Sequence, residues 1–339
     1  MPPVSTCRAD EANGRSLVIR EPRRGRRYAR GAAVLMALFV ATLATVIVSG
    51  LFWQQFVLIR TIENQQLVVQ SRILMAGALD WARAMLREDS IRSSHDGLDE
   101  FWAKGLAETR LDQLGESSAL AAQASIAGSI EDAQSRLNLR NLVGDDGEID
   151  DKELQSLTRL CELLGLPPVS AELIALRMRE AFAPHSTDDG ASATVPDVRP
   201  LPPIRSGDLA AIPGLEAEAA AKLAPYVVVL DGSKVPLNVN TASAEAIAAR
   251  IGISLAQARG LVAQRDRISH FVDVGNFRNY LGEGTELADN SVATSSSYFF
   301  VRGHIRLARA DIRMEALVHR AAQGQPGGRS VEVLWQREL

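Results

Sequence analysis

The chain has 339 residues, of which 46% are hydrophobic and 23% charged, and its formal net charge at pH 7 is −4. This length accommodates one membrane helix and one or two domains. Residues 1–31 hold eight arginines and three acids, a net charge of +5, so the remainder carries −9. An acidic body argues against general nucleic-acid binding, which depends on lysines and arginines that displace phosphate counterions.

A long uncharged segment follows the arginine-rich start of the chain. Between Gly31 and Arg60 there is no Asp, Glu, Lys or Arg. As an α-helix, residues 32–53 would be roughly 33 Å long, which is enough to cross the hydrocarbon core of a bilayer. A cleaved signal peptide has a shorter apolar region, and a core helix of a soluble protein shows a polar face. A transmembrane helix over residues 32–53 is therefore the favoured interpretation.

The arginines lie on only one flank of this helix. By the positive-inside rule, residues 1–31 stay in the cytoplasm and the rest of the chain lies across the membrane. Cys7 and Cys161 would then be on opposite sides of the membrane and could not pair. The sequence therefore predicts no disulfide framework.

The helix is predicted to continue as an amphipathic segment over residues 54–89. No proline occurs between residues 54 and 87. The apolar positions recur at helical spacing, at Ile62, Val69, Ile73 and Ala76, with Trp81 and Leu86 as an extension of the stripe. Such a stripe has to be buried, and a sheet of the same chain is the simplest partner for it. A juxtamembrane coiled coil is the alternative, although sustained heptads are absent.

The spacing of apolar residues changes twice along the remaining chain. Residues 90–143 are predicted to form the first part of a sheet domain, with two short strands between 119 and 143. Residues 144–290 read as paired helices in two subdomains, separated by a proline-rich linker over 184–206. Residues 291–339 alternate apolar and polar side chains, which predicts C-terminal strands. The sequence thus predicts an α+β fold in which an all-α domain is inserted into one sheet.

Two helical segments, residues 212–223 and 251–265, resemble helix-hairpin-helix units. Such units bind DNA when backbone N–H groups of a glycine-rich turn face a phosphate. The turn at Ile253-Ser254 lacks a second glycine, and residues 238–282 hold five arginines against three acids. Helical packing and protein contact are favoured, and a membrane-anchored helix-hairpin-helix protein that binds nucleic acid is retained as the alternative function.

An acidic run near residue 147 offers oxygen ligands at close spacing. The candidate calcium ligands are Asp145, Asp146, Glu148 and Asp150. The run lacks the spacing and the terminal glutamate of an EF-hand, and acids also favour the N-terminus of the helix expected from Asp151. Both readings stay open, and no cofactor is required.

No catalytic constellation is visible in the sequence. The five histidines are scattered, and the HExxH, CxxC, GxSxG and phosphate-binding Gly-Lys motifs are all missing. The sequence therefore predicts a protein that is not an enzyme.

Several segments together resemble one family. They are the basic leader with Gly31, the long membrane helix, DAQSRLNLRNLV at 132–143, LLGLPP at 163–168, LAPYVVVL at 223–230 and LNVNTASAEAI at 237–247. These segments look like those of the minor pseudopilin K family of type II secretion. The resemblance covers nearly the whole chain. It implies a pilin-like long helix packed on an antiparallel sheet, with an inserted SAM-like domain.

The resemblance also implies a processing route and a place in an assembly. A prepilin peptidase would cut residues 1–31 away between Gly31 and Ala32, and the new N-terminus would be methylated. Major pilins carry a glutamate at the fifth mature position, which is Met36 here. A subunit without that acid fits the tip of the pseudopilus, with minor pseudopilins I and J as partners. The expected location is the bacterial inner membrane, with a single span and a periplasmic C-terminal domain.

The sequence departs from the family in two places. The leader is unusually long for a prepilin, and residues 186–205 lack the acidic, tyrosine-rich linker expected between the helical subdomains.

Overall fold

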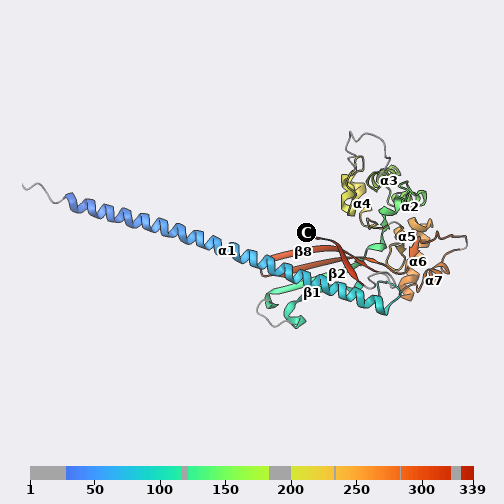
Figure 1. The fold of residues 1–339 in the computed structure, drawn as a ribbon, viewed down its shortest axis with the longest axis horizontal. Coiled ribbons are helices and arrows are strands. Elements are labelled where there is room, and N and C mark those ends of the chain that lie inside the picture. Colours follow the sequence, from blue (N-terminus) through green and yellow to red (C-terminus); the bar gives the residue numbers. More distant parts are fainter. Residues whose placement is uncertain (1–27, 116–120, 183–199, 233, 283, 322–329) are drawn as a thin grey trace, which may run out of the picture. The chain divides into compact units, whose positions relative to one another are not determined.

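The computed structural model describes residues 28–115, 121–182, 200–232, 234–282, 284–321 and 330–339 (Figure 1). The chain divides into two compact units, Met1–Glu63 and Asn64–Leu339. The predicted leader lies largely outside the described residues, as does most of the linker predicted at 184–206.

The first unit holds the beginning of the helix α1 (Tyr28–Arg92). Its most apolar 18-residue window has a mean hydropathy of 2.5 and no buried residue. Among the described residues it is the one helix whose length and composition suit a membrane crossing. The hydroxyls of Thr42 and Thr45 donate to the carbonyls of Phe39 and Ala41, each at 2.8 Å, so these polar groups are satisfied within the helix.

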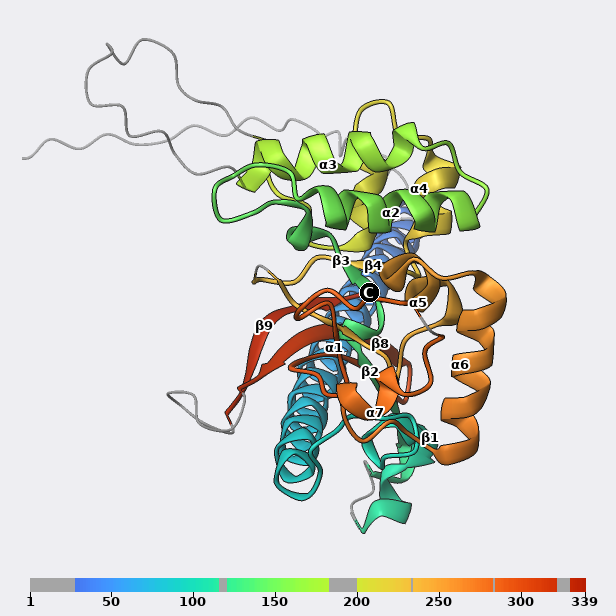
Figure 2. The same cartoon turned by 90° about the vertical axis from the view of Figure 1, so that its right-hand side faces the viewer.

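In the second unit, the end of α1 packs on a five-stranded antiparallel sheet (Figure 2). The strand order is β1-β2-β7-β8-β9. The strands are β1 (Leu106–Arg110), β2 (Ala124–Asp132), β7 (Tyr298–Leu307), β8 (Ala310–Arg320) and β9 (Val331–Glu338). This arrangement confirms the predicted α+β class with a long helix on an antiparallel sheet. The strand β1 was not expected from the sequence.

The stripe of α1 that contacts the sheet differs from the predicted one. The buried residues are Met75, Leu79, Ala82 and Leu86, and they pack against Phe299, Val301, Ile305 and Met314. The predicted stripe was wrong at its four main positions: Ile62, Val69 and Ile73 are exposed to 45%, 54% and 66%, and Ala76 is exposed as well. Of its extension, Trp81 is exposed and Leu86 is buried. The helix has two apolar faces, and the sheet takes the face that fits closely over Gly303. A Cβ at Gly303 would lie 2.6 Å from the Met75 sulfur.

The helical insertion lies in the chain between β2 and β7. Its helices are α2 (Asp151–Leu163), α3 (Val169–Phe182), α4 (Ala217–Leu223), α5 (Ala244–Ile251), α6 (Leu255–Ile268) and α7 (Val274–Arg278). In Figure 2, α2 and α3 lie side by side. One hydrophobic cluster includes Leu160 and Ile174 from the first half and Phe271 and Phe277 from the second. The division into two subdomains stays a prediction.

Short elements complete the second unit. The parallel pairs are β3 (Leu137–Asn138) with β4 (Val227–Val228), and β5 (Leu237–Asn238) with β6 (Val292–Ala293). The 3-10 helices span Trp102–Lys104, Leu111–Leu114, Ala121–Gln123, Ala133–Ser135, Leu139–Leu142 and Ser206–Ala211.

Candidate functional site

The predicted cleavage position lies in the exposed, helical start of α1. A Cβ built on Gly31 would meet no heavy atom within 4 Å. Ala32 is exposed, and Met36 is 67% exposed. The Gly31–Ala32 bond is therefore not covered by other described parts of the chain. Cleavage and methylation stay predictions.

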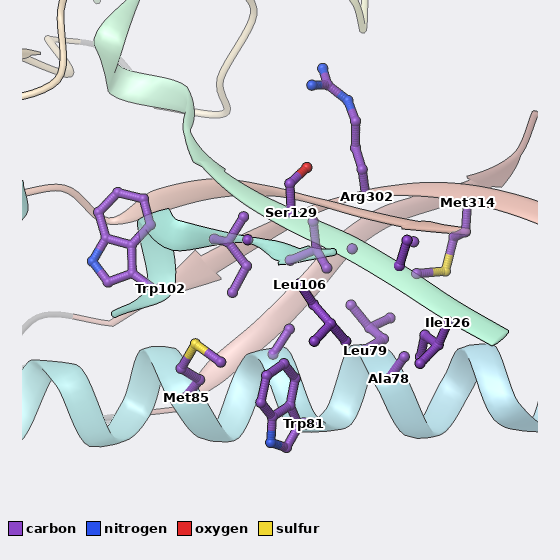
Figure 3. Close-up of a pocket in the computed structure, with 17 residues that line it drawn as sticks. Ala78, Leu79, Trp81, Met85, Trp102, Leu106, Ile126, Ser129, Arg302 and Met314 are labelled. Atoms are coloured by element: carbon purple, nitrogen blue, oxygen red, sulfur yellow. The ribbon is translucent and has the colours of Figure 1, made fainter. Parts of the chain in front are cut away.

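The second apolar face of α1 remains exposed in the second unit. Val69 and Ile73 belong to this face, and Trp81 is exposed on a neighbouring side of the helix. Phe101, which follows α1 in the chain, is 70% exposed and lies with Trp81 along one shallow pocket. Figure 3 shows an adjoining groove between α1 and the first strands, with Leu79, Leu106 and Ile126 inside it. Large apolar side chains that are exposed close to one another are typical of an interaction face.

The acidic run has local structural roles. Asp150 caps α2 by accepting from the backbone N–H groups of Lys152 at 2.9 Å and Glu153 at 3.2 Å. Asp146 accepts from the Glu148 N–H at 3.1 Å. Among the described residues, the groups close enough to share an ion lie elsewhere, at His95, Asp99 and His270 and at Asp89, Asp96 and Glu100. Calcium binding by Asp145, Asp146, Glu148 and Asp150 stays a prediction.

A buried carboxylate joins the sheet to the helical insertion. Asp132, the last residue of β2, is 4% exposed. Its Oδ2 accepts from three side chains: Asn238 Nδ2 at 2.8 Å, Thr241 Oγ1 at 2.5 Å and Ser296 Oγ at 2.6 Å. Its Oδ1 accepts from the Gln134 N–H at 2.7 Å. Burial, with a smaller contribution from the negative charge of Asp96, raises the pKa of Asp132 to about 6, while these side-chain donors oppose that shift.

The two asparagines of the motif at 237–247 form hydrogen bonds to residues that are distant in the sequence. Asn238 also donates to the Asp96 carbonyl at 3.0 Å. Asn240 accepts from the Phe271 N–H at 2.8 Å and donates to the Phe271 carbonyl at 3.0 Å. It also donates to the Thr294 carbonyl at 3.2 Å. From the sequence, this motif was used only as a family resemblance, and the linking of distant segments by its asparagines was missed. The available signal was the presence of amide side chains among apolar residues, since buried amides have to be hydrogen-bonded.

A buried ion pair ties the end of α1 to the sheet. Arg320 of β8 donates to both carboxylate oxygens of Asp96, at 2.7 and 2.6 Å, and to Asp89 at 2.9 Å. It also donates to the Leu86 carbonyl of α1 at 3.2 Å. Arg320 and Asp96 are 7% and 1% exposed. Removal of either partner would leave an uncompensated buried charge.

Of the two helix-hairpin-helix-like segments, residues 212–223 form a turn and α4, and residues 251–265 form the end of α5, a turn and most of α6. Gly252 adopts a left-handed φ of 80° after α5, and Ser254 and Gln257 form a capping box that starts α6. The Arg159 guanidinium lies 3.0 Å from where a Cβ on Gly252 would be. The turn is thus partly covered by a side chain from α2.

These features define a pilin-like subunit with a membrane-compatible helix and a helical insertion held on its sheet. The family model described as "Type II secretion system (T2SS), protein K" matches residues 237–295, and the model of its first domain matches residues 135–232. The type II secretion system protein K of Pseudomonas aeruginosa is 27% identical over 318 residues, covering 89% of this chain and 91% of that protein.

A solved structure shares the fold. It is the GspK-GspI-GspJ complex of the type 2 secretion system of enterotoxigenic Escherichia coli, one chain of which matches with a TM-score of 0.63 and 22% identity. The match covers 81% of this chain and 98% of that chain. Over residues 135–232 and 237–295 the chain is similar to type II secretion protein K, and these comparisons support a minor pseudopilin of type II secretion. None of the reported matches is to a nucleic-acid-binding protein.

Substitution of Asn238 tests the polar junction. Asn238→Ala removes a donor from Asp132 and from the Asp96 carbonyl, and we expect the free energy of unfolding to fall by about 2–3 kcal/mol. Urea denaturation of the full chain in mild detergent, followed by tryptophan fluorescence, measures the loss. The control is Asn279→Ala, at an exposed asparagine of the same insertion, with an expected effect within about 0.5 kcal/mol. Equal effects of the two substitutions would contradict the assigned role.

The raised pKa of Asp132 predicts a pH dependence with a definite sign. The pKa of Asp132 is about 6 in the folded chain against an ordinary value of 3.8, so between these pH values the folded chain binds a proton that the unfolded chain does not. The resulting stabilisation is fully present at low pH and is lost as pH rises through about 6. Asp132→Ala should therefore cost about 2 kcal/mol more at pH 4.5 than at pH 7.5. Urea denaturation of the unsubstituted chain and of Asp132→Ala at pH 4.5 and pH 7.5 checks this. A larger loss of unfolding free energy at pH 7.5 would contradict the predicted sign.

Proposed function

We propose that this chain is a non-enzymatic subunit at the tip of the type II secretion pseudopilus, needed for export of folded proteins across the outer membrane. The exposed apolar face of α1 carries the proposal, because a helix with one face on its own sheet and a second face free is suited to assembly with other helices. The arginines before the span support an inner-membrane anchor with the C-terminal domain in the periplasm.

The proposal includes processing at the start of α1. Prepilin peptidase cuts between Gly31 and Ala32, and Ala32 is then N-methylated. The open surroundings of Gly31 support this step, since a protease needs an accessible bond. Removal of the basic leader takes away the charge that fixes the orientation of the span in the inner-membrane lipid.

Met36 supports the place at the tip. In a filament whose subunits bury a fifth-position carboxylate against the N-terminal amine of a neighbour, the charge is compensated only when that neighbour is present. Met36 has no charge to compensate. A subunit with methionine there is stable without the neighbour, as the last subunit of a filament must be.

Minor pseudopilins I and J are the proposed partners. The Escherichia coli relative of similar fold is in a complex with GspI and GspJ. The surface we assign to them is the exposed face of α1 with Val69 and Ile73, together with Trp81 and Phe101. Apolar side chains of this size are typical anchors of protein interfaces. No nucleic-acid partner and no cofactor is required, and calcium at the acidic run is an optional addition.

Substitution of Gly31 tests the processing step. Gly31→Val should leave residues 1–31 attached and abolish export, because a β-branched side chain beside the bond obstructs the peptidase. Intact mass of the purified chain and the secreted protein in the medium are the measurements. Gly50→Val is the control, since Gly50 is equally unpacked but lies inside the span, and it should be processed normally. Normal export with Gly31→Val would refute the proposed route.

Substitution of exposed apolar residues of α1 tests the partner assignment. Ile73→Asp and Trp81→Asp should each lower co-purification of I and J at least about tenfold, because a carboxylate placed in an apolar interface must be desolvated. Quantitative co-purification from membranes measures the effect. The control is Val169→Asp at the start of α3, where the side chain is 51% exposed, and it should leave binding unchanged. Equal losses from all three substitutions would argue against α1 as the docking face.

A further inference from the structure

Two histidines that are 175 positions apart in the sequence meet in the second unit. His95 lies in the segment after α1, and His270 follows α6. Their ring centroids are 3.5 Å apart, and the rings are inclined by 16°. Asp99 Oδ2 lies 3.3 Å from His270 Nδ1. We propose that His95, Asp99 and His270 form a zinc site that links the segment after α1 to the helical insertion.

The ligand set fits zinc better than calcium. One ligand atom from each of the three residues lies within 4.8 Å of the others. Zinc in proteins is bound by imidazole nitrogens and carboxylate oxygens at about 2.0–2.2 Å, whereas calcium takes six to eight oxygens. Movements on the order of 1 Å therefore bring the three ligand atoms to the separations that ligands have around a tetrahedral zinc ion. Two imidazoles favour a borderline transition metal over a hard cation.

Glu100 is the candidate for the fourth ligand. Its Oε1 lies 3.9 Å from His95 Nε2. Its Oε2 accepts from the Gly97 N–H at 3.1 Å and from Trp102 Nε1 at 2.9 Å, which fixes the carboxylate with Oε1 left toward the histidine. A ligand held in this way by hydrogen bonds is typical of metal sites, where outer contacts orient the inner ones.

The backbone on both sides of the site is held by the buried junction. Phe271, next to His270, has its N–H and its carbonyl bonded to Asn240. Asp96, next to His95, is bound to Arg320, and its N–H donates to the Thr294 carbonyl at 2.9 Å. These contacts place both histidines before any ion binds, which lowers the entropy lost on binding.

Two local backbone features bring the segments close. Ser269 ends α6 with a φ of +75°, a conformation that is costly for a residue with a side chain and that turns His270 out of the helix. A Cβ on Gly97 would lie 2.6 Å from Asp99 Oδ1 and 3.6 Å from His270 Cβ. The absence of a side chain at Gly97 therefore lets the segment after α1 pass beside His270.

The site is accessible and can adjust. The side chains of His95, His270 and Asp99 are 18%, 25% and 38% exposed, so an ion can enter from solvent. The two rings stack on each other, and zinc binding requires each ring to turn until a nitrogen lone pair faces the ion. This ring rotation is about the χ2 torsion of histidine, which has a broad energy minimum. Ser93 Oγ, 3.1 Å from His95 Nδ1, can then hold that nitrogen and leave Nε2 for the metal.

Metal uptake by the full chain tests the site. The chain is purified in detergent without a polyhistidine tag, equilibrated with zinc chloride and measured for zinc content. We expect one zinc per chain and, with cobalt(II) as the probe, the visible absorption of four-coordinate cobalt. His95→Gln and His270→Gln should each weaken affinity by roughly 10- to 100-fold. Zinc should also raise the unfolding temperature of the unsubstituted chain but not that of His270→Gln.

A matched control is available on the sheet. His304 lies 2.9 Å from Asp311, so it is also a histidine beside a carboxylate, but it belongs to none of the metal-compatible groups among the described residues. His304→Gln should leave zinc binding unchanged. Asp99→Asn, at a partly exposed position, provides a ligand variant that does not threaten folding. No zinc uptake, or equal uptake by the His95→Gln/His270→Gln double variant, would overturn the proposal, and neither result bears on the role in the pseudopilus.

Discussion

The structure of the second unit depends on one buried carboxylate and the donors around it. Asp132 ends the strand after which the chain leaves the sheet, and Ser296 lies just before the strand on which the chain returns. Asn238 and Thr241, from inside the insertion, bind the same oxygen. A buried carboxylate is costly unless its acceptors are all used. The requirement for these donors therefore fixes how the helical insertion is attached to the sheet.

The same region controls the end of the long helix. Arg320 binds Asp96, Asp89 and the Leu86 carbonyl, so α1, the segment after it and the sheet are joined at one guanidinium. Asp96 is in turn linked to Asn238 through its carbonyl. The end of α1, the sheet and the insertion are therefore linked by one connected set of hydrogen bonds.

Much of this fold could be predicted from the sequence because the strongest signals are periodic. The uncharged run after Gly31, the change to alternating residues after 291 and the helical segments between them predict the class and the inserted arrangement. The choice of the buried stripe of α1 could not be predicted, since both stripes are apolar. It is decided by the contact of Met75 with Gly303, which depends on a strand more than 200 residues away.

The residues that hold the molecule together were harder to predict than its elements. Asn238 and Asn240 lie in a motif that the sequence marks, but their partners come from other segments, and hydrogen bonds between distant residues leave no periodic trace. The pairing of His95 with His270 is hidden for the same reason. Scattered histidines carry no spacing signal, and only the folded chain shows which of them meet.

Hydrogen exchange of the full chain in detergent, followed by mass spectrometry, tests most directly whether the sheet and the insertion form one unit. If the Asp132 junction joins them, peptides that cover 237–243 and 294–297 should exchange as slowly as those from β7 and β8, through a single cooperative opening. Fast exchange of the insertion while β7 and β8 stay protected would contradict the account, because the two parts would then open independently.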